Sequence, residues 1–99
     1  MKDNKKLQDK RLWQQLGHEL AALQVLLPAI ACDYYGLFDD KAIRKLVRMG
    51  DHLLDVRSAM EAKMSQHVPD WSTEVFYPTR RAAIDAACEA FRKILKEEQ

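Results

Sequence analysis

The chain has 99 residues, of which 47% are hydrophobic and 31% are charged, and its formal net charge is +1. This length supports one domain with its own core, and this composition excludes a disordered chain. Because the net charge is so small, no overall field attracts nucleic acid or an anionic membrane. Three glycines and three prolines are too few for a loop-rich or all-β fold.

The two cysteines, Cys32 and Cys88, match no C-x-x-C metal or redox spacing. The first dozen residues are mostly charged or amidic and do not resemble a secretory signal. We therefore predict a cytoplasmic protein whose two thiols are reduced and largely buried.

The longest apolar stretch, residues 20–31, is interrupted by Gln24 and Pro28. A membrane-spanning helix needs about 20 apolar residues, so we predict no membrane anchor here. Apolar residues at alternating spacings of three and four instead predict a helix that packs along a seam. The seam positions are Trp13, Leu16, Leu20, Leu23, Leu27, Ile30 and Tyr34.

The same helix is apolar outside its seam, at Ala22, Val25, Leu26 and Ala29. A helix that is apolar nearly all round needs neighbours on more than one side. It either lies at the centre of the domain or is shared with a second copy of the chain. We predict that these four residues form a homodimer interface.

A tight turn follows, in which Gly36 is expected to adopt the left-handed cap conformation, with Leu37 folding back onto the helix. Asp39 is the expected N-cap of a second helix over residues 40–66. Gly50 lies within the apolar face of that helix, which predicts a close helix approach at this point.

The segment 68–78 lies between prolines and has no sustained period, although residues 70–76 can form one short helical turn. A third helix is predicted over residues 79–96, and the ends, 1–6 and 97–99, are expected to fray. Small alanines accompany its apolar stripe, which consists of Ile84, Ala87, Cys88, Phe91, Ile94 and Leu95.

The predicted fold is all-α: an up-down-up three-helix bundle over a single domain, residues 1–99. Two long helices form an αα-hairpin, and a shorter third helix packs against it. Because the third helix is shorter, we expect part of the hairpin to be left uncovered, which also favours a homodimer.

An aromatic loop with a following arginine pair is the strongest candidate for partner binding. Tryptophan, tyrosine and arginine are enriched at binding hot spots, although the loop can equally plug the open end of the bundle. Cations in a first helical turn oppose the macrodipole, so the arginines either bind an anion or are neutralised within the fold. The candidates are Trp71, Phe76, Tyr77, Arg80 and Arg81.

Two alternatives depend on charge and on histidine. A cationic face on the second helix suggests a nucleic-acid-binding regulator, although acidic residues farther along reverse its sign; the face comprises Lys41, Arg44, Lys45 and Arg48. His18 and His67 are expected at one end of the bundle, which suggests a metal site. No His-x-x-x-His or Glu-x-x-His pair supports that site.

The sequence contains no nucleophile constellation and no phosphate-binding loop, so we predict a non-catalytic protein without a cofactor. The leading interpretation is a small helical protein–protein interaction module. It would act by contact as a regulator, adaptor or inhibitor, with another protein or a second copy of itself as partner. The nucleic-acid-binding regulator and the metal-binding bundle are the alternatives.

Overall fold

The computed structural model describes residues 4–71 and 73–98, and the described chain is all-α, as predicted. The predicted fraying of the ends concerns in part residues 1–3 and 99, which lie outside the described residues. Within the described residues, positions 4–6 belong to the short helix Asn4–Leu7, and the last helix includes Glu97, so these positions are helical. The elements are α1 (Asn4–Leu7), α2 (Lys10–Asp33), η1 (Tyr35–Leu37), α3 (Asp40–His67), η2 (Thr73–Phe76) and α4 (Arg80–Glu97).

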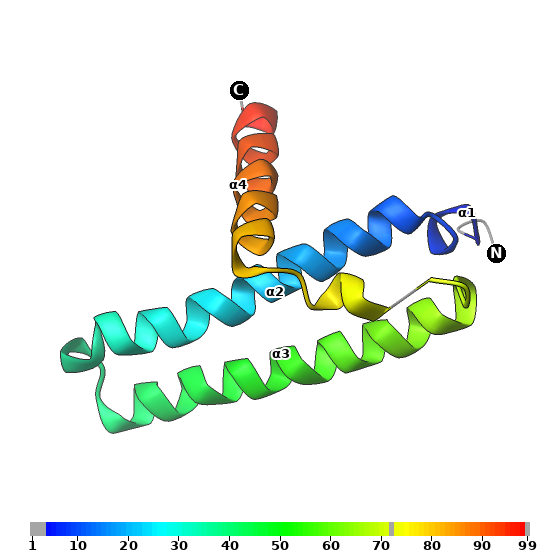
Figure 1. The fold of residues 1–99 in the computed structure, drawn as a ribbon. Helices are drawn as coiled ribbons and strands as arrows, with labels where there is room; N and C mark the ends of the chain where they lie inside the picture. Colours follow the sequence, from blue (N-terminus) through cyan, green and yellow to red (C-terminus); the bar gives the residue numbers. More distant parts are fainter. Residues whose placement is uncertain (1–3, 72, 99) are drawn as a thin grey trace.

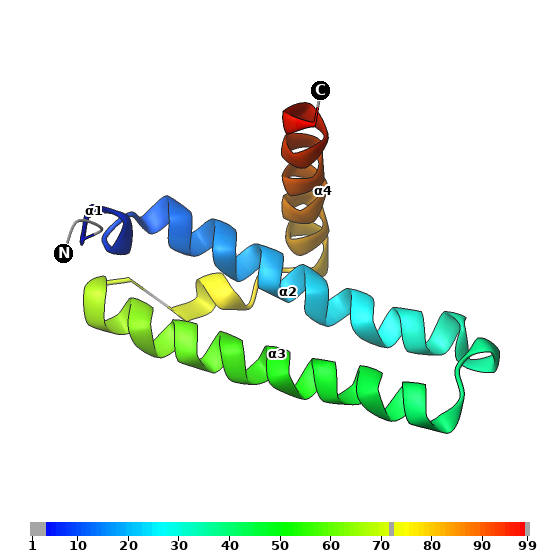
Figure 2. The same cartoon turned by 180° about the vertical axis from the view of Figure 1, so that it is seen from behind.

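The two long helices, α2 and α3, lie side by side and antiparallel, which confirms the predicted αα-hairpin (Figures 1 and 2). Each begins at an aspartate that accepts a hydrogen bond from a backbone N–H of the first turn. Asp9 accepts from the Arg11 amide at 3.0 Å and Asp39 from the Ala42 amide at 2.7 Å. Asp39 therefore caps α3 as the sequence predicts.

The turn between these helices differs from the expectation. No glycine among the described residues has a positive φ, so the predicted left-handed conformation of Gly36 is wrong. Residues 35–37 form the 3₁₀ helix η1, in which the Leu37 amide donates to the Tyr34 carbonyl at 2.9 Å. A tightened last turn satisfies helix-end carbonyls without a left-handed residue. Leu37 does not fold back, because it is 84% exposed.

The core lies at the open end of the hairpin, where the segment between α3 and α4 fills the space between the two long helices. Met64 and Phe76 are fully buried there beside Trp13 and Val68. The Trp13 indole N–H donates to the Leu7 carbonyl at 2.7 Å, which ties α1 to this end. The side chains packed around this cluster are Leu7, Leu16, Leu20, Met60, Trp71 and Val75.

The close backbone approach occurs at Gly17 and not at Gly50. A Cβ atom built on Gly17 would lie 2.5 Å from the Val75 carbonyl oxygen, whereas nothing lies within 4 Å of one built on Gly50. The predicted close approach at Gly50 is therefore wrong. Gly17 allows η2 to lie directly on α2, since any side chain there would collide with backbone atoms.

The shorter third helix, α4, stands away from the hairpin at a steep angle instead of lying along it (Figure 1). Thr79 caps it by accepting a hydrogen bond from the Ala82 amide at 3.1 Å. Its alanine-rich first half packs on α2, with Ala83 buried, and its second half extends beyond the hairpin. Among the described residues, no third helix covers the hairpin beyond this crossing.

The fit at Gly17 predicts opposite outcomes for two matched substitutions. Gly17→Ala should lower the free energy of unfolding by about 1–3 kcal/mol, because the new methyl group must displace backbone. Gly50→Ala should raise it by about 0.5–1 kcal/mol, since alanine is the better helix former in open space. Urea unfolding followed by circular dichroism, at one fixed protein concentration, measures both. Equal shifts for the two variants would contradict the close approach.

Candidate interaction surface

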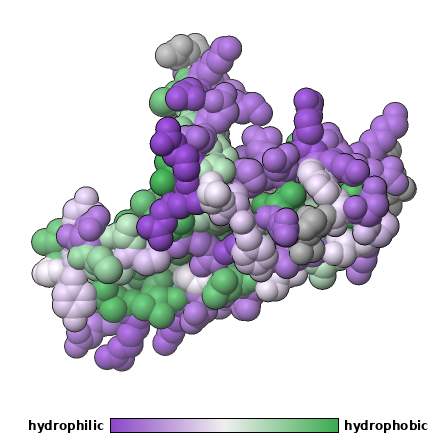
Figure 3. All heavy atoms as spheres, viewed as in Figure 1, coloured by the Kyte–Doolittle hydropathy of each residue, from purple (hydrophilic) through white to green (hydrophobic). Residues whose placement is uncertain are grey.

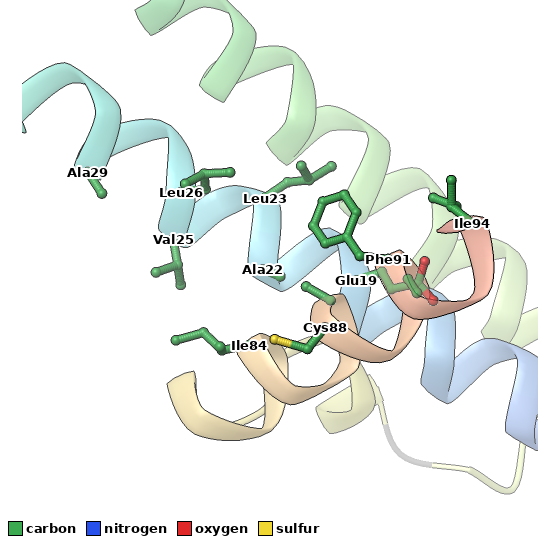
Figure 4. A pocket seen from close by; sticks show the side chains of 12 residues that line it. Glu19, Ala22, Leu23, Val25, Leu26, Ala29, Ile84, Cys88, Phe91 and Ile94 are labelled. Carbon is green, nitrogen blue, oxygen red and sulfur yellow. The ribbon is translucent and has the colours of Figure 1, made fainter. Parts of the chain in front are cut away.

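An open apolar groove of about 460 Å³ lies in the corner between α2 and α4 (Figure 4). Glu19 is the one charged residue among those that line it. All four residues predicted as a dimer interface line this groove, namely Ala22, Val25, Leu26 and Ala29. The other wall comes from α4, whose apolar stripe the sequence analysis identified but did not assign to an interface. It consists of Ile84, Ala87, Cys88, Ala90, Phe91 and Ile94.

The two faces of α4 differ in side-chain size. The face toward α2 carries small residues, such as Ala83, Ala86 and Ala90, all buried or half-buried. The large apolar side chains lie on a different face and are exposed: Phe91 and Leu95 are each 62% exposed. The face with small residues lets α4 pack closely on α2, and the face with large apolar residues is left exposed to solvent.

The exposed face of α4 has the spacing of a helix-pairing seam. Ile84, Cys88, Phe91 and Leu95 follow one another at intervals of four, three and four residues. This is the a/d pattern by which one helix packs against another. All four side chains are exposed in the monomer, so no helix within the described residues covers this seam.

The monomer exposes far more surface than a protein of its mass normally does. Its accessible surface is 7815 Å² for 11.5 kDa. The usual scaling for folded monomers gives about 5,800 Å², so the excess is about 2,000 Å². The radius of gyration, 15.7 Å, also exceeds the roughly 13 Å expected of a compact domain of this length. In Figure 3, hydrophobic residues reach this surface beside α4 and along the hairpin toward its turn.

The aromatic loop is divided between core and surface. Phe76 is fully buried and Trp71 is half-buried against the core cluster, so both help to plug the open end of the hairpin. Tyr77 is exposed, and the Arg80 and Arg81 side chains also face solvent. Arg81 forms an exposed ion pair with Asp85 at 3.7 Å. Of the five candidates for partner binding, the structure assigns Phe76 to the core.

A buried polar cluster, which the sequence interpretation did not anticipate, fixes the segment that leads into α4. The Arg57 guanidinium is buried and donates to the Gln24 side-chain carbonyl oxygen at 2.7 Å and to the Phe76 backbone carbonyl. It also lies 4.8 Å from the centre of the Tyr77 ring. Arginine 57 therefore joins α2, α3 and the end of η2 through one side chain.

Glu61 completes this cluster from the next turn of α3. Its hydrogen bond with the Tyr77 hydroxyl raises the pKa of Tyr77, and the nearby Arg57 charge partly opposes that increase. Among the described residues, Glu61 Oε1 and Arg57 Nε are buried without a hydrogen-bond partner. Helical amphipathicity predicts a polar surface residue at position 57, so only the tertiary contact with η2 reveals this role.

Loss of the Arg57 side chain should destabilise the fold much more than loss of a surface arginine. Arg57→Met removes two charge-assisted hydrogen bonds and takes away the positive charge next to the half-buried Glu61. We therefore expect the free energy of unfolding to fall by about 3 kcal/mol. Arg92→Met is the control, because its ion pair with Glu89 is exposed, and we expect a change within about 0.5 kcal/mol. Urea unfolding measures the stability of both variants. Similar losses of unfolding free energy would contradict the role of Arg57 in fixing the segment before α4.

The remaining charged candidates are dispersed. Lys41, Arg44, Lys45 and Arg48 are exposed along the first half of α3, and none forms an ion pair among the described residues. His18 and His67 are both half-buried. Within residues 4–71 and 73–98, no group of three or more His, Cys, Asp or Glu side chains is arranged to hold a metal ion.

The two thiols are free, but the prediction that they are largely buried is wrong, because both Cys32 and Cys88 are exposed. Cys88 lies in the groove, on the α4 seam. Cys32 lies near the end of α2, at the edge of a second hollow of about 300 Å³ between the hairpin helices. The two cysteines therefore mark two different surfaces of the chain.

No protein-family model, curated protein or solved structure matches this chain. Within the described residues, α2 is the one helix long and apolar enough to cross a membrane, judged by length and composition alone. Mostly buried core helices of soluble proteins and signal sequences near an N-terminus meet the same criterion, and 11% of this apolar window is buried. The function is therefore inferred from the geometry of the surface.

Proposed function

We propose that this chain is a small, non-catalytic helical interaction module whose interface is the groove between α2 and α4. The observation that supports this proposal most directly is the exposed seam of α4, of which Ile84, Cys88 and Phe91 line one wall of an almost wholly apolar groove. An exposed apolar patch bounded by polar residues is typical of protein–protein interfaces and ligand-binding grooves.

The shape and chemistry of the groove favour a helix as its occupant over a small molecule. Sites for small ligands combine an apolar lining with a few polar groups that fix the orientation of the ligand. Glu19 is the one charged residue in the lining of this groove, which is open to solvent. Its walls are two helices whose apolar residues recur every three or four positions, which is how amphipathic helices are recognised.

The natural cysteines allow the interface to be tested without engineering a probe. If the groove is covered in solution, Cys88 should react with a maleimide at least about tenfold more slowly than Cys32, because thiol reactivity requires access. Leu26→Asp places a charge in the groove and should abolish that difference. The measurement is alkylation of the native, untagged chain followed by mass spectrometry, with Cys32 as the internal reference.

Equal reaction rates at Cys32 and Cys88 at every protein concentration, in the native chain as in Leu26→Asp, would contradict the proposal. Protection that increases with protein concentration identifies self-association as its cause. Protection that is independent of concentration indicates a different, tightly bound occupant, such as a lipid or another protein.

A further inference from the structure

We propose that the groove is filled by a second copy of this chain, and that the two copies pair through antiparallel α4 helices. This inference depends on the proposed function, since it names the partner of the same groove. In this arrangement, the second half of α4 from one copy lies in the corner between α2 and α4 of the other. The exchange is reciprocal and generates a two-fold symmetric dimer.

The amount of uncovered surface matches what such a dimer requires. Obligate homodimers bury about 2,000–5,000 Å² in total, or roughly 1,000–2,500 Å² from each chain. The excess of about 2,000 Å² over a monomer of this mass lies within that range. A short peptide or a single acyl chain would cover only part of it. A symmetric partner covers the same surface on both molecules at once.

The spacing of the seam is self-complementary when the helix runs antiparallel to itself. Intervals of four, three and four read the same in both directions, so Ile84 lies opposite Leu95 of the second copy and Cys88 opposite its Phe91. In this register the two-fold axis passes between positions 88 and 91. The pairing buries the most exposed large apolar side chains of α4, since Phe91 and Leu95 are each 62% exposed in the monomer.

The charges on α4 favour the antiparallel direction over the parallel one. The helix begins with Arg80 and Arg81 and ends with Glu97 and its C-cap Glu98, and both pairs oppose the preference of the macrodipole, although Lys96 also lies in the last turn. Antiparallel pairing places each arginine pair beside the glutamates of the other copy. Parallel pairing would place like charges together at each end.

A second charge pair along the same flank agrees with this direction. Asp85 and Arg92 are one heptad apart on one edge of the seam, and each is exposed and satisfied only locally, by Arg81 and Glu89. Flanking positions of this type meet across an antiparallel helix pair, which brings Asp85 of one copy beside Arg92 of the other. In an antiparallel dimer, opposite charges therefore meet both at the ends of α4 and along one edge of it.

Disulfide mapping tests the direction of pairing. In a Cys32→Ser, Cys88→Ser background, Ile84→Cys and Leu95→Cys each carry a single thiol on the seam. When the two variants are mixed and oxidised, we expect a cross-linked product that joins position 84 to position 95. Each variant alone should stay uncross-linked, because two copies of position 84 would lie about 16 Å apart along the helix axes. Lys93→Cys, exposed and off the seam, measures random collision.

Each result separates this inference from the proposed function. Cross-linking of each variant with itself would show parallel pairing and overturn the inference, while leaving the groove an interface. No cross-link, with Cys88 still protected in the native chain, would assign the groove to another occupant and also overturn it. No cross-link together with a reactive Cys88 would overturn both. Circular dichroism of each variant confirms that the helices are retained.

Discussion

The contact between η2 and Gly17 is the constraint on which the rest of this structure depends. Since glycine has no side chain, the Val75 carbonyl can approach α2 closely enough for Phe76 to enter the core. Arg57 then holds the Phe76 carbonyl from α3, so the segment before α4 is fixed to both long helices. The chain leaves these contacts with Gly17 and Arg57 at Pro78, and α4 begins near the middle of α2 (Figure 1). From that starting point α4 crosses α2 at a steep angle, and its second half extends into solvent (Figure 1).

That geometry leads to the division of α4 into two faces. Alanines allow α4 to cross α2 closely, while the larger apolar residues are left on the neighbouring face. The chain therefore buries little of its own apolar content: Met64 and Phe76 are the largest fully buried side chains. Much of the hydrophobic stabilisation that this composition can supply is available only through association. The proposed interface would therefore bury apolar side chains that the fold of a single chain leaves exposed.

Periodic patterns predicted the helices well and the tertiary contacts poorly. The αα-hairpin, the Asp39 cap and the third helix follow from local spacing and capping chemistry, which the sequence carries directly. The apolar residues of α2 outside its seam were also identified, and the structure places them on the groove. The direction of α4, the role of Gly17 and the burial of Arg57 depend on where η2 docks. No local period encodes that docking, so Gly50 was expected to make the close approach that Gly17 makes.

Sedimentation equilibrium of the native, untagged chain tests the central claim most directly, because mass does not depend on the shape of the molecule. The account predicts a mass of twice 11.5 kDa at micromolar concentration, with dissociation to 11.5 kDa in a Phe91→Asp variant that keeps its helical content. A native mass of 11.5 kDa at every concentration would contradict it, since the apolar face of α4 would then be stable in water without a second copy.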